Sequence, residues 1–372
     1  MTKHVLQPLA LTLGCALLLA GCIADDSDGN NSGCGTTGQS ARGLYVVNQG
    51  NTGYSILGTL DWIDTEADTL ASDIFSRANG QALGENPQNA VISGSKMYIS
   101  EFTSNRIWVV SAATSALLGQ IEVQQPNRVY AHGAYVYATS NTGTVSRIDT
   151  ASLQIDRQLT VGPNPVGMVA AGGYLYVANS DGYNYPTYDN GKSVSKISLS
   201  AFEETTRISV GLNPQNLAAD AAGNVFVYCG GNYADIGPVI QKITADDHVS
   251  DFTSASMMAT DGEKIYLIKQ SYDANWNSTY EYFTMNTLTA DTLAPADDAM
   301  QHVKDDAPDN PTGIFIDPES HEIYITSDAV TAADGSTNAY TSPGSVMYYC
   351  PRGYFQQRYT VGVHPVWIAF RN

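Results

Sequence analysis

The sequence is poor in basic residues, and this scarcity excludes one class of partner. The 372 residues include 18 Lys and Arg against 37 Asp and Glu, which gives a formal net charge of −19. A chain this acidic is repelled by nucleic-acid backbones and by anionic membrane surfaces. We therefore exclude nucleic-acid binding and look for a ligand, a sugar or a protein as the partner.

The sequence also lacks the short motifs of local catalytic sites. It has no HExxH, GxSxG or CxxC motif and no Gly-rich phosphate loop. The histidines after the N-terminal segment are too far apart to form a local metal-ligand motif: His132, His248, His302, His321 and His364. We expect His364 to be a turn residue. An enzyme built from distant residues would escape this test, but we expect no enzymatic activity, no metal and no cofactor.

Long apolar runs are missing except at the N-terminus. Lys3 and His4 precede an apolar run over 9–20, which is too short for a permanent membrane span and is typical of an export signal. Its ending, Leu-Ala-Gly-Cys22, resembles the bacterial lipobox, which implies cleavage before Cys22 and a lipid on its sulfur. The alternative is an ordinary secretory signal with an incidental cysteine.

Residues 22–42 are expected to be a lipidated cysteine followed by a flexible acidic tether. They are small and polar, and Asp25, Asp26 and Asp28 come soon after Cys22. The acidic run resembles the sorting signal that sends some lipoproteins to the outer face of the outer membrane. The alternative is a tether that is merely solvated. The expected organisation is a signal peptide at 1–21, this tether, and one domain at 43–372.

The domain is built from a repeat of about 40–50 residues, which is clearest at 164–198. Each unit has a proline turn, a short apolar run, a Gly-rich turn and an aromatic-aliphatic run. The turns are Asn86-Pro87, Gln125-Pro126, Asn164-Pro165, Asn213-Pro214, Asn310-Pro311 and His364-Pro365, and one unit has Ala255 in place of the proline. The aromatic anchors are Tyr98, Tyr137, Tyr176, Phe226, Tyr266 and Tyr324. Short strands at this period predict an all-β fold, a β-propeller with one four-stranded blade per repeat.

Six units are complete, and two pieces remain at the ends of the chain. Residues 364–370 have the turn and first strand only, whereas 43–75 have the second anchor, Tyr45, without a preceding strand. Together they make a seventh blade. The C-terminal strand should therefore close the ring inside the N-terminal blade and leave no free sheet edge.

Cysteines within the repeats are few. Cys34 lies in the tether, whereas Cys229 and Cys350 lie in strand-like runs two repeats apart. This separation argues against a disulfide between the last two, and we expect both to be buried free thiols.

One face of the propeller should carry the binding residues. The proline turns and the loops between second and third strands open on the same face, here called the turn face, and the other is the opposite face. The long loops at 179–192, 229–237, 269–280 and 327–344 belong to the turn face and are rich in Tyr, Asn, Asp, Ser and Gly. This composition is typical of a binding surface. The alternative is that tyrosine, with 23 copies, simply covers the blade rims.

The repeat resembles that of the YncE-like seven-bladed propellers. Within that group, GLYVVNQGN (43–51), LDWID (60–64) and the stretch 72–100 resemble the BtuG-type surface lipoproteins. Those proteins capture cobalamin and pass it to an outer-membrane TonB-dependent transporter. The resemblance implies a lipid-anchored protein at the cell surface of the outer membrane. It also implies that a corrinoid is its transported ligand, not a cofactor, and that such a transporter is its partner.

A corrinoid is a large, flat ring with an amide fringe, which suits aromatic faces together with amide and guanidinium groups. By position on the turn face and by chemistry, the candidate ligand-binding residues are Gln88, Asn89, Arg128, Asn213, Gln215, Trp367, Tyr183, Tyr185, Tyr188, Tyr233, Tyr272, Trp276 and Tyr340. Two other functions stay open. They are a surface module that binds carbohydrate or protein, and a propeller hydrolase or lyase.

Overall fold

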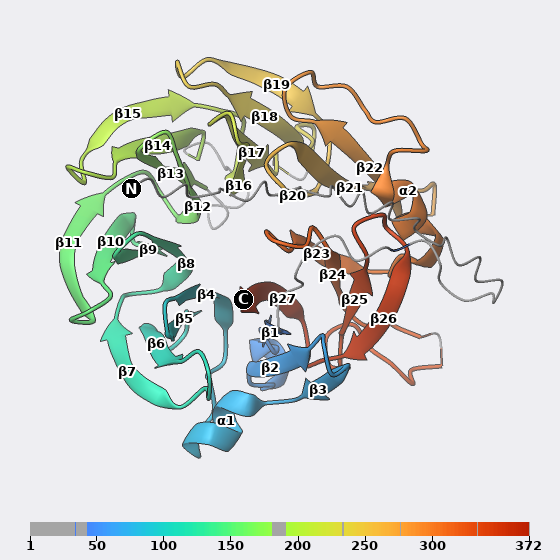
Figure 1. The fold of residues 1–372 in the computed structure, drawn as a ribbon, viewed down its shortest axis with the longest axis horizontal. Coiled ribbons are helices and arrows are strands. Elements are labelled where there is room, and N and C mark those ends of the chain that lie inside the picture. Colours follow the sequence, from blue (N-terminus) through green and yellow to red (C-terminus); the bar gives the residue numbers. More distant parts are fainter. Residues whose placement is uncertain are drawn as a thin grey trace, which may run out of the picture. The chain divides into compact units, whose positions relative to one another are not determined.

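The computed structural model describes Cys34 and residues 43–180, 191–232, 234–275, 277–332 and 334–371. Seven antiparallel sheets surround a central axis as the blades of a propeller (Figure 1). Six sheets have four strands, and one has three. The predicted all-β, seven-bladed fold is confirmed. Among the described residues, no helix is both long enough and apolar enough to cross a membrane.

The blades follow one another along the chain, and the first strand of each is innermost. Blade 1 contains β4 (Pro87–Ser93), β5 (Lys96–Glu101), β6 (Arg106–Ser111) and β7 (Leu117–Glu122). Blade 2 contains β8 (Pro126–His132), β9 (Tyr135–Ser140), β10 (Thr144–Asp149) and β11 (Gln154–Thr160). Blade 3 contains β12 (Pro165–Ala171), β13 (Tyr174–Asn179), β14 (Ser193–Ser198) and β15 (Glu204–Ser209). Blade 4 contains β16 (Pro214–Ala219), β17 (Val225–Cys229), β18 (Val239–Ile243) and β19 (Val249–Thr253).

The last three blades carry the irregular elements. Blade 5 contains β20 (Met257–Thr260), β21 (Lys264–Tyr272) and β22 (Ser278–Asn286), followed by α2 (Ala299–Val303) and the 3-10 helix η2 (Lys304–Asp306). Blade 6 contains β23 (Pro311–Ile316), β24 (Ile323–Ser327), β25 (Ser345–Tyr349) and β26 (Phe355–Thr360). Blade 7 contains β27 (Pro365–Arg371), β1 (Gly43–Asn48), β2 (Thr59–Asp64) and β3 (Thr69–Ala71), with the 3-10 helix η1 (Thr52–Tyr54) and α1 (Ile74–Asn79).

The aromatic anchors of the repeat fill the spaces between blades. All seven lie on second strands and are at most 3% exposed. Each belongs to a different buried cluster, which it shares with the next blade. Tyr98, for example, packs with Val129 and Val136 of blade 2. Burying one large ring per blade explains why the anchor recurs with the period of the fold, because apolar burial stabilises by about 25 cal/mol per Å².

The prolines of the repeat mark a break in strand pairing. In the six inner strands that start with proline, the pairing register shifts within the next few residues, as between Pro87 and Asn89. Such bulges turn a side chain away from the regular alternation. The side chains of Gln88 and Gln215, which lie within such bulges, therefore do not follow the regular alternation of their strands. The strand without proline, β20, pairs with β21 without a shift.

The ring closes as the sequence predicts. β27 lies in the innermost position of blade 7 and pairs with β1, with Val46 opposite Ile368 and Tyr45 opposite Ala369. The ends of the described chain thus lie in one sheet, and the seam is a strand pair like those inside the other blades (Figure 1).

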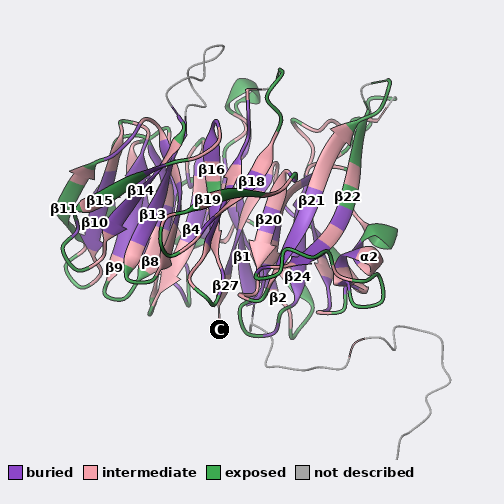
Figure 2. Cartoon of the chain, turned by 90° about the horizontal axis from the view of Figure 1, so that it is seen from above, coloured by how far each residue is buried: buried purple, intermediate pink, exposed green. Residues whose placement is uncertain are grey.

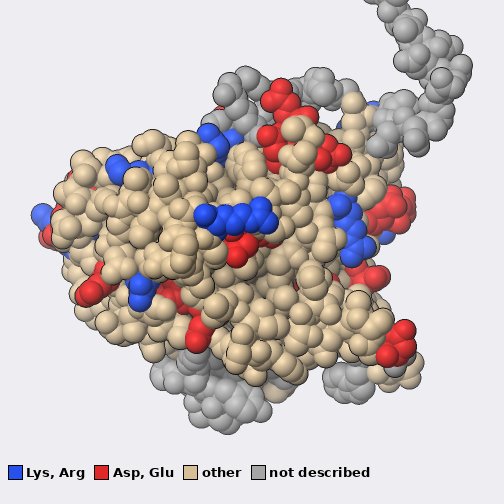
Figure 3. Space-filling view, turned by 90° about the horizontal axis from the view of Figure 1, so that it is seen from below, with Lys and Arg blue, Asp and Glu red and all other residues tan. Residues whose placement is uncertain are grey.

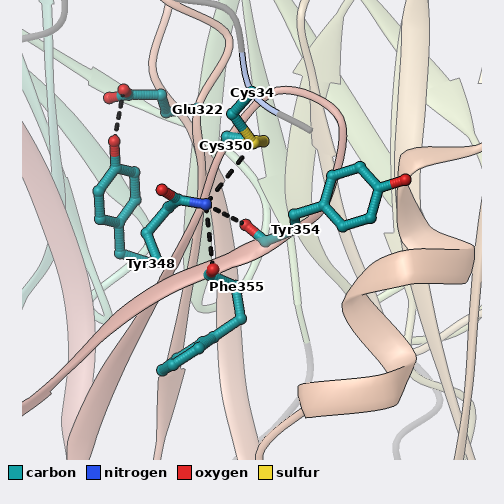
Figure 4. The surroundings of a disulfide bond; sticks show 7 residues. Cys34, Glu322, Tyr348, Cys350, Tyr354 and Phe355 are labelled. Carbon is teal, nitrogen blue, oxygen red and sulfur yellow. Dashed lines mark hydrogen bonds between the residues drawn. A yellow bond between two sulfur atoms is a disulfide. The ribbon is translucent and has the colours of Figure 1, made fainter. Parts of the chain in front are cut away.

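The structure corrects the prediction for Cys350. It forms a disulfide with Cys34, at a Cα–Cα distance of 6.1 Å, and is not a free thiol. The physical reason is topological: β25 ends on the opposite face, and β1 of the next blade starts on that face, so Cys34, which precedes β1 in the sequence, meets Cys350 there. Figure 4 shows the bond beside Tyr354 and Phe355. The prediction that Cys229 is a buried free thiol is confirmed.

Candidate functional site

The turn face is the more elaborated end of the ring. Figure 2 shows β21 and β22 rising beyond the neighbouring blades on this face. These strands have nine residues each, so the sequence prediction of a loop over 269–280 is wrong for most of that stretch. Lys269 pairs with Glu281 at 3.1 Å across the two strands. Such cross-strand contacts let polar residues extend a hairpin.

A central cavity of about 190 Å³ lies between the inner strands of five blades and β27. It brings together three of the candidates chosen from sequence: Arg128, Gln215 and Trp367. The other lining residues were not among the candidates, because most of them are apolar or lie within strands rather than in the loops of the turn face. The position just after the proline would have indicated some of them. The remaining lining residues are Val166, Asn216, Tyr228, Ser256, Met257, Met258, Thr312, Gly313, Ile314, Phe315 and Val366.

Arg128 is held against the wall of this cavity. Its guanidinium lies 5.0 Å from the ring centre of Trp367 and donates from Nη1 to the backbone oxygen of Gln88. Trp367 in turn meets Phe315 edge-on, with 5.5 Å between ring centres. Burial lowers the pKa of Arg128 to about 10, so the side chain remains a cation at neutral pH.

Two other candidates lie inside the protein rather than on its surface. Asn89 is 1% exposed, and its side-chain amide makes two hydrogen bonds to the next inner strand. Its Nδ2 donates to the backbone oxygen of Val129, and its Oδ1 accepts from the backbone nitrogen of Val129, at 2.9 Å each. Asn213 is fully buried, and its Oδ1 accepts from Ser180 Oγ. The side chain of Gln88 donates to Asn86 Oδ1 at 2.7 Å. Asn89 therefore joins blades 1 and 2, and its amide is not presented to a ligand.

Aromatic side chains stand exposed on the turn face. Tyr272 is 59% exposed at the end of β21, and Tyr340 is 60% exposed in the loop between β24 and β25. Tyr340 stacks on Tyr54, with ring centres 6.3 Å apart. Tyr54 was missed from sequence, although its loop joins the second and third strands of blade 7. The candidates that lie outside the described residues are Tyr183, Tyr185, Tyr188, Tyr233 and Trp276.

The stacked pair Tyr54–Tyr340 lies beside a second cavity of about 260 Å³ on the turn face. His364 lines it and holds Asp328 through Nδ1, at 2.9 and 3.0 Å from the two carboxylate oxygens. His364 also has a left-handed backbone, with φ 55°, directly before Pro365. The other lining residues are Gln49, Gly50, Asn51, Thr52, Glu85, Asn86 and Ala339.

On the side shown in Figure 3, Lys and Arg are interspersed with Asp and Glu among uncharged residues. No group of three or more His, Cys, Asp and Glu side chains in the described part of the chain is placed to hold a metal ion.

Comparison with known proteins supports the fold alone. The chain matches the hydrazine synthase of Kuenenia stuttgartiensis with a TM-score of 0.58 at 17% identity, over 76% of this chain and 89% of that one. It matches the computationally designed protein Ika8 with a TM-score of 0.56 at 10% identity, over 90% and 92% of the two chains. No protein-family model matches the sequence, and no curated protein does. At such identities, the structural similarity supports the class of fold, a seven-bladed β-propeller, and says nothing about the function of this chain.

Proposed function

We propose that this protein is a cell-surface lipoprotein that binds a corrinoid such as cobalamin on the turn face. It would pass the ligand unchanged to an outer-membrane TonB-dependent transporter. The observation that supports this proposal is the meeting of Arg128, Gln215 and Trp367 in one cavity, with Tyr272 and Tyr340 exposed on the same face. Aromatic faces cover apolar ring surface, and amide and guanidinium groups bind the amide fringe.

The size of the central cavity decides how such a ligand would lie. Pockets that enclose drug-sized ligands measure about 300–1,000 Å³, whereas this cavity holds about 190 Å³. A corrinoid ring is therefore placed flat over the mouth, and only a substituent enters the cavity. The rim tyrosines then contact the ring, and the cavity residues contact what projects from it.

The expected lipid anchor is consistent with a turn face that points away from the membrane. The disulfide at Cys350 fixes Cys34 to the opposite face. If Cys22 carries lipid, twelve residue steps separate the anchor from this point. They span at most about 40 Å when extended, at 3.3–3.6 Å per residue. The turn face then remains open to solution, and the transporter meets the protein at the mouth through which the ligand entered.

The direct test is calorimetric titration of the purified mature protein with cyanocobalamin. Tyr340→Ala and Tyr272→Ala should each weaken binding, and loss of a true aromatic anchor costs upwards of about 2 kcal/mol, roughly thirtyfold in Kd. Tyr354→Ala is the matched control, because Tyr354 follows the disulfide on the opposite face and stacks on His302 at 4.2 Å. Unchanged binding by both rim variants would show that the site lies elsewhere. No binding by the wild type would refute the ligand assignment.

One observation favours carbohydrate as a second candidate ligand. The parallel rings of Tyr54 and Tyr340 adjoin the second cavity, whose lining is largely polar. Flat aromatic faces beside amide and carboxylate groups suit a sugar ring as well as a corrinoid edge. Tyr54→Ala separates the two: it should abolish sugar binding, whereas Arg128→Gln should leave sugar binding intact.

A further inference from the structure

Among the described residues that line the central cavity, Arg128 is a cation and none is an acidic counter-ion. None of the 14 described residues that line it is Asp or Glu, although the whole chain carries 37 of them. A guanidinium has five N–H donors. Within the described part of the chain, the Arg128 side chain makes one hydrogen bond, to the backbone oxygen of Gln88. Four donors of a cation that lines the cavity thus have no hydrogen-bond partner among the described residues.

Further hydrogen-bond donors lie in blade 4 around Gln215, which lines the cavity. Asn213 Nδ2 is buried and has no hydrogen-bond partner among the described residues. Gly230 leaves space beside it: a Cβ placed there would lie 3.0 Å from Gln215 Nε2, 3.3 Å from Asn213 Nδ2 and 3.5 Å from Tyr228 Oη. A buried donor without an acceptor is unfavourable, because it has given up its hydrogen bonds to water. Gln215, whose amide lies near this donor, is the residue of the pair that lines the cavity.

We propose that the central cavity is an oxyanion site in which the Arg128 guanidinium, assisted by the Gln215 amide, binds one phosphate-ester or carboxylate group. The fork of the guanidinium matches two oxygens of such a group, and the surrounding groups are donors rather than carboxylates. A volume of about 190 Å³ admits one small group of this kind and not a whole corrinoid.

This inference deepens the proposed function, and its application to cobalamin rests on that function. Cobalamin carries a phosphodiester in its nucleotide loop, and that group is the oxyanion that the cavity would receive. The positive site would also select among ligands, because the overall charge of −19 repels anions that no specific site binds.

Free oxyanions test the site without any corrinoid. Dimethyl phosphate and acetate are titrated calorimetrically into the purified mature protein at low ionic strength, with sodium chloride as the reference salt. Arg128→Gln should weaken binding about ten- to a hundredfold, as expected for charge-assisted hydrogen bonds. The matched control is Arg106→Gln. Arg106 lies 4.7 Å from the Trp108 ring but on the third strand of blade 1, away from the cavity.

Arg128→Lys keeps the test decisive if the glutamine variant does not fold. It retains the charge and loses the two-pronged geometry, so its affinity should fall between those of wild type and Arg128→Gln. Absence of saturable oxyanion binding by the wild type overturns the proposal. So does binding that Arg128→Lys leaves unchanged, or that Arg106→Gln weakens equally.

A pair of corrinoids then identifies the source of the oxyanion. Arg128→Gln should weaken binding of cyanocobalamin and leave that of cobinamide, which lacks the phosphodiester, unchanged. Equal effects on both corrinoids overturn the assignment of the phosphodiester to the cavity. If the wild type binds dimethyl phosphate but neither corrinoid, the proposed function fails and the oxyanion site stands.

Discussion

Ile368→Ala in β27 should destabilise the protein by about 2–5 kcal/mol, as buried large-to-small changes do. Ile368 is 3% exposed, lies opposite Val46 of β1 and packs in one cluster with Tyr324 and Val361. Removing three buried carbon atoms costs about 2.4 kcal/mol at about 0.8 per CH₂, and the cavity left behind adds to this. Total stabilities are about 5–15 kcal/mol, so one such change at the seam is a large part of the whole.

The assay is urea unfolding followed by tryptophan fluorescence, with Ile314→Ala as the matched control. Ile314 is 5% exposed on β23, an inner strand that pairs with its sequence neighbour β24. If β27 closes the ring as described, the two variants should lose similar stability, within about 1 kcal/mol. The reasoning is refuted if Ile368→Ala loses less than about 0.5 kcal/mol while Ile314→Ala shows the full effect.

Four further predictions concern the cysteines. The disulfide closes a loop with a sequence separation of 316, so Cys350→Ser should cost about 2–4 kcal/mol, and a urea midpoint that does not change would contradict this. Burial raises the pKa of the Cys229 thiol to about 12. Iodoacetamide at pH 8 should therefore modify Cys229 only after unfolding, and labelling of the folded protein would refute its burial. An unfolded thiol has a pKa of about 8.5. Between that pH and about 12, unfolding therefore releases the proton of Cys229, and the free energy of unfolding should fall as the pH rises through this range. Protease added to intact cells should release the domain anchored at Cys22, and protection until lysis would exclude surface display.

The fold could be predicted from sequence because two signals repeat in step. Each proline turn starts an inner strand, and each aromatic anchor fills the layer to the next blade, so both follow the period of the structure. The seventh blade followed from the two incomplete pieces. Each of these signals is local in the sequence, so it can be recognised without knowledge of which distant residues are in contact.

What the sequence did not indicate depends on residues that meet only in the folded ring. Cys34 and Cys350 are far apart in the chain but meet where blades 6 and 7 adjoin. The cavity around Arg128 is assembled from inner strands of several blades. No single stretch of the sequence therefore shows that its described lining lacks Asp and Glu. The polar residues at the tip of the β21–β22 hairpin predict a loop from sequence, whereas in the structure most of them pair across the two strands.

The central claim is that the turn face binds a corrinoid, and hydrogen exchange with and without saturating cyanocobalamin tests it most directly. The ligand should slow exchange of backbone amides in the turn-face loops at 49–58 and 334–344 and near Arg128. Amides around Cys350 on the opposite face should exchange at the same rate in both samples. Protection confined to the opposite face, or no protection at any amide, would contradict the account.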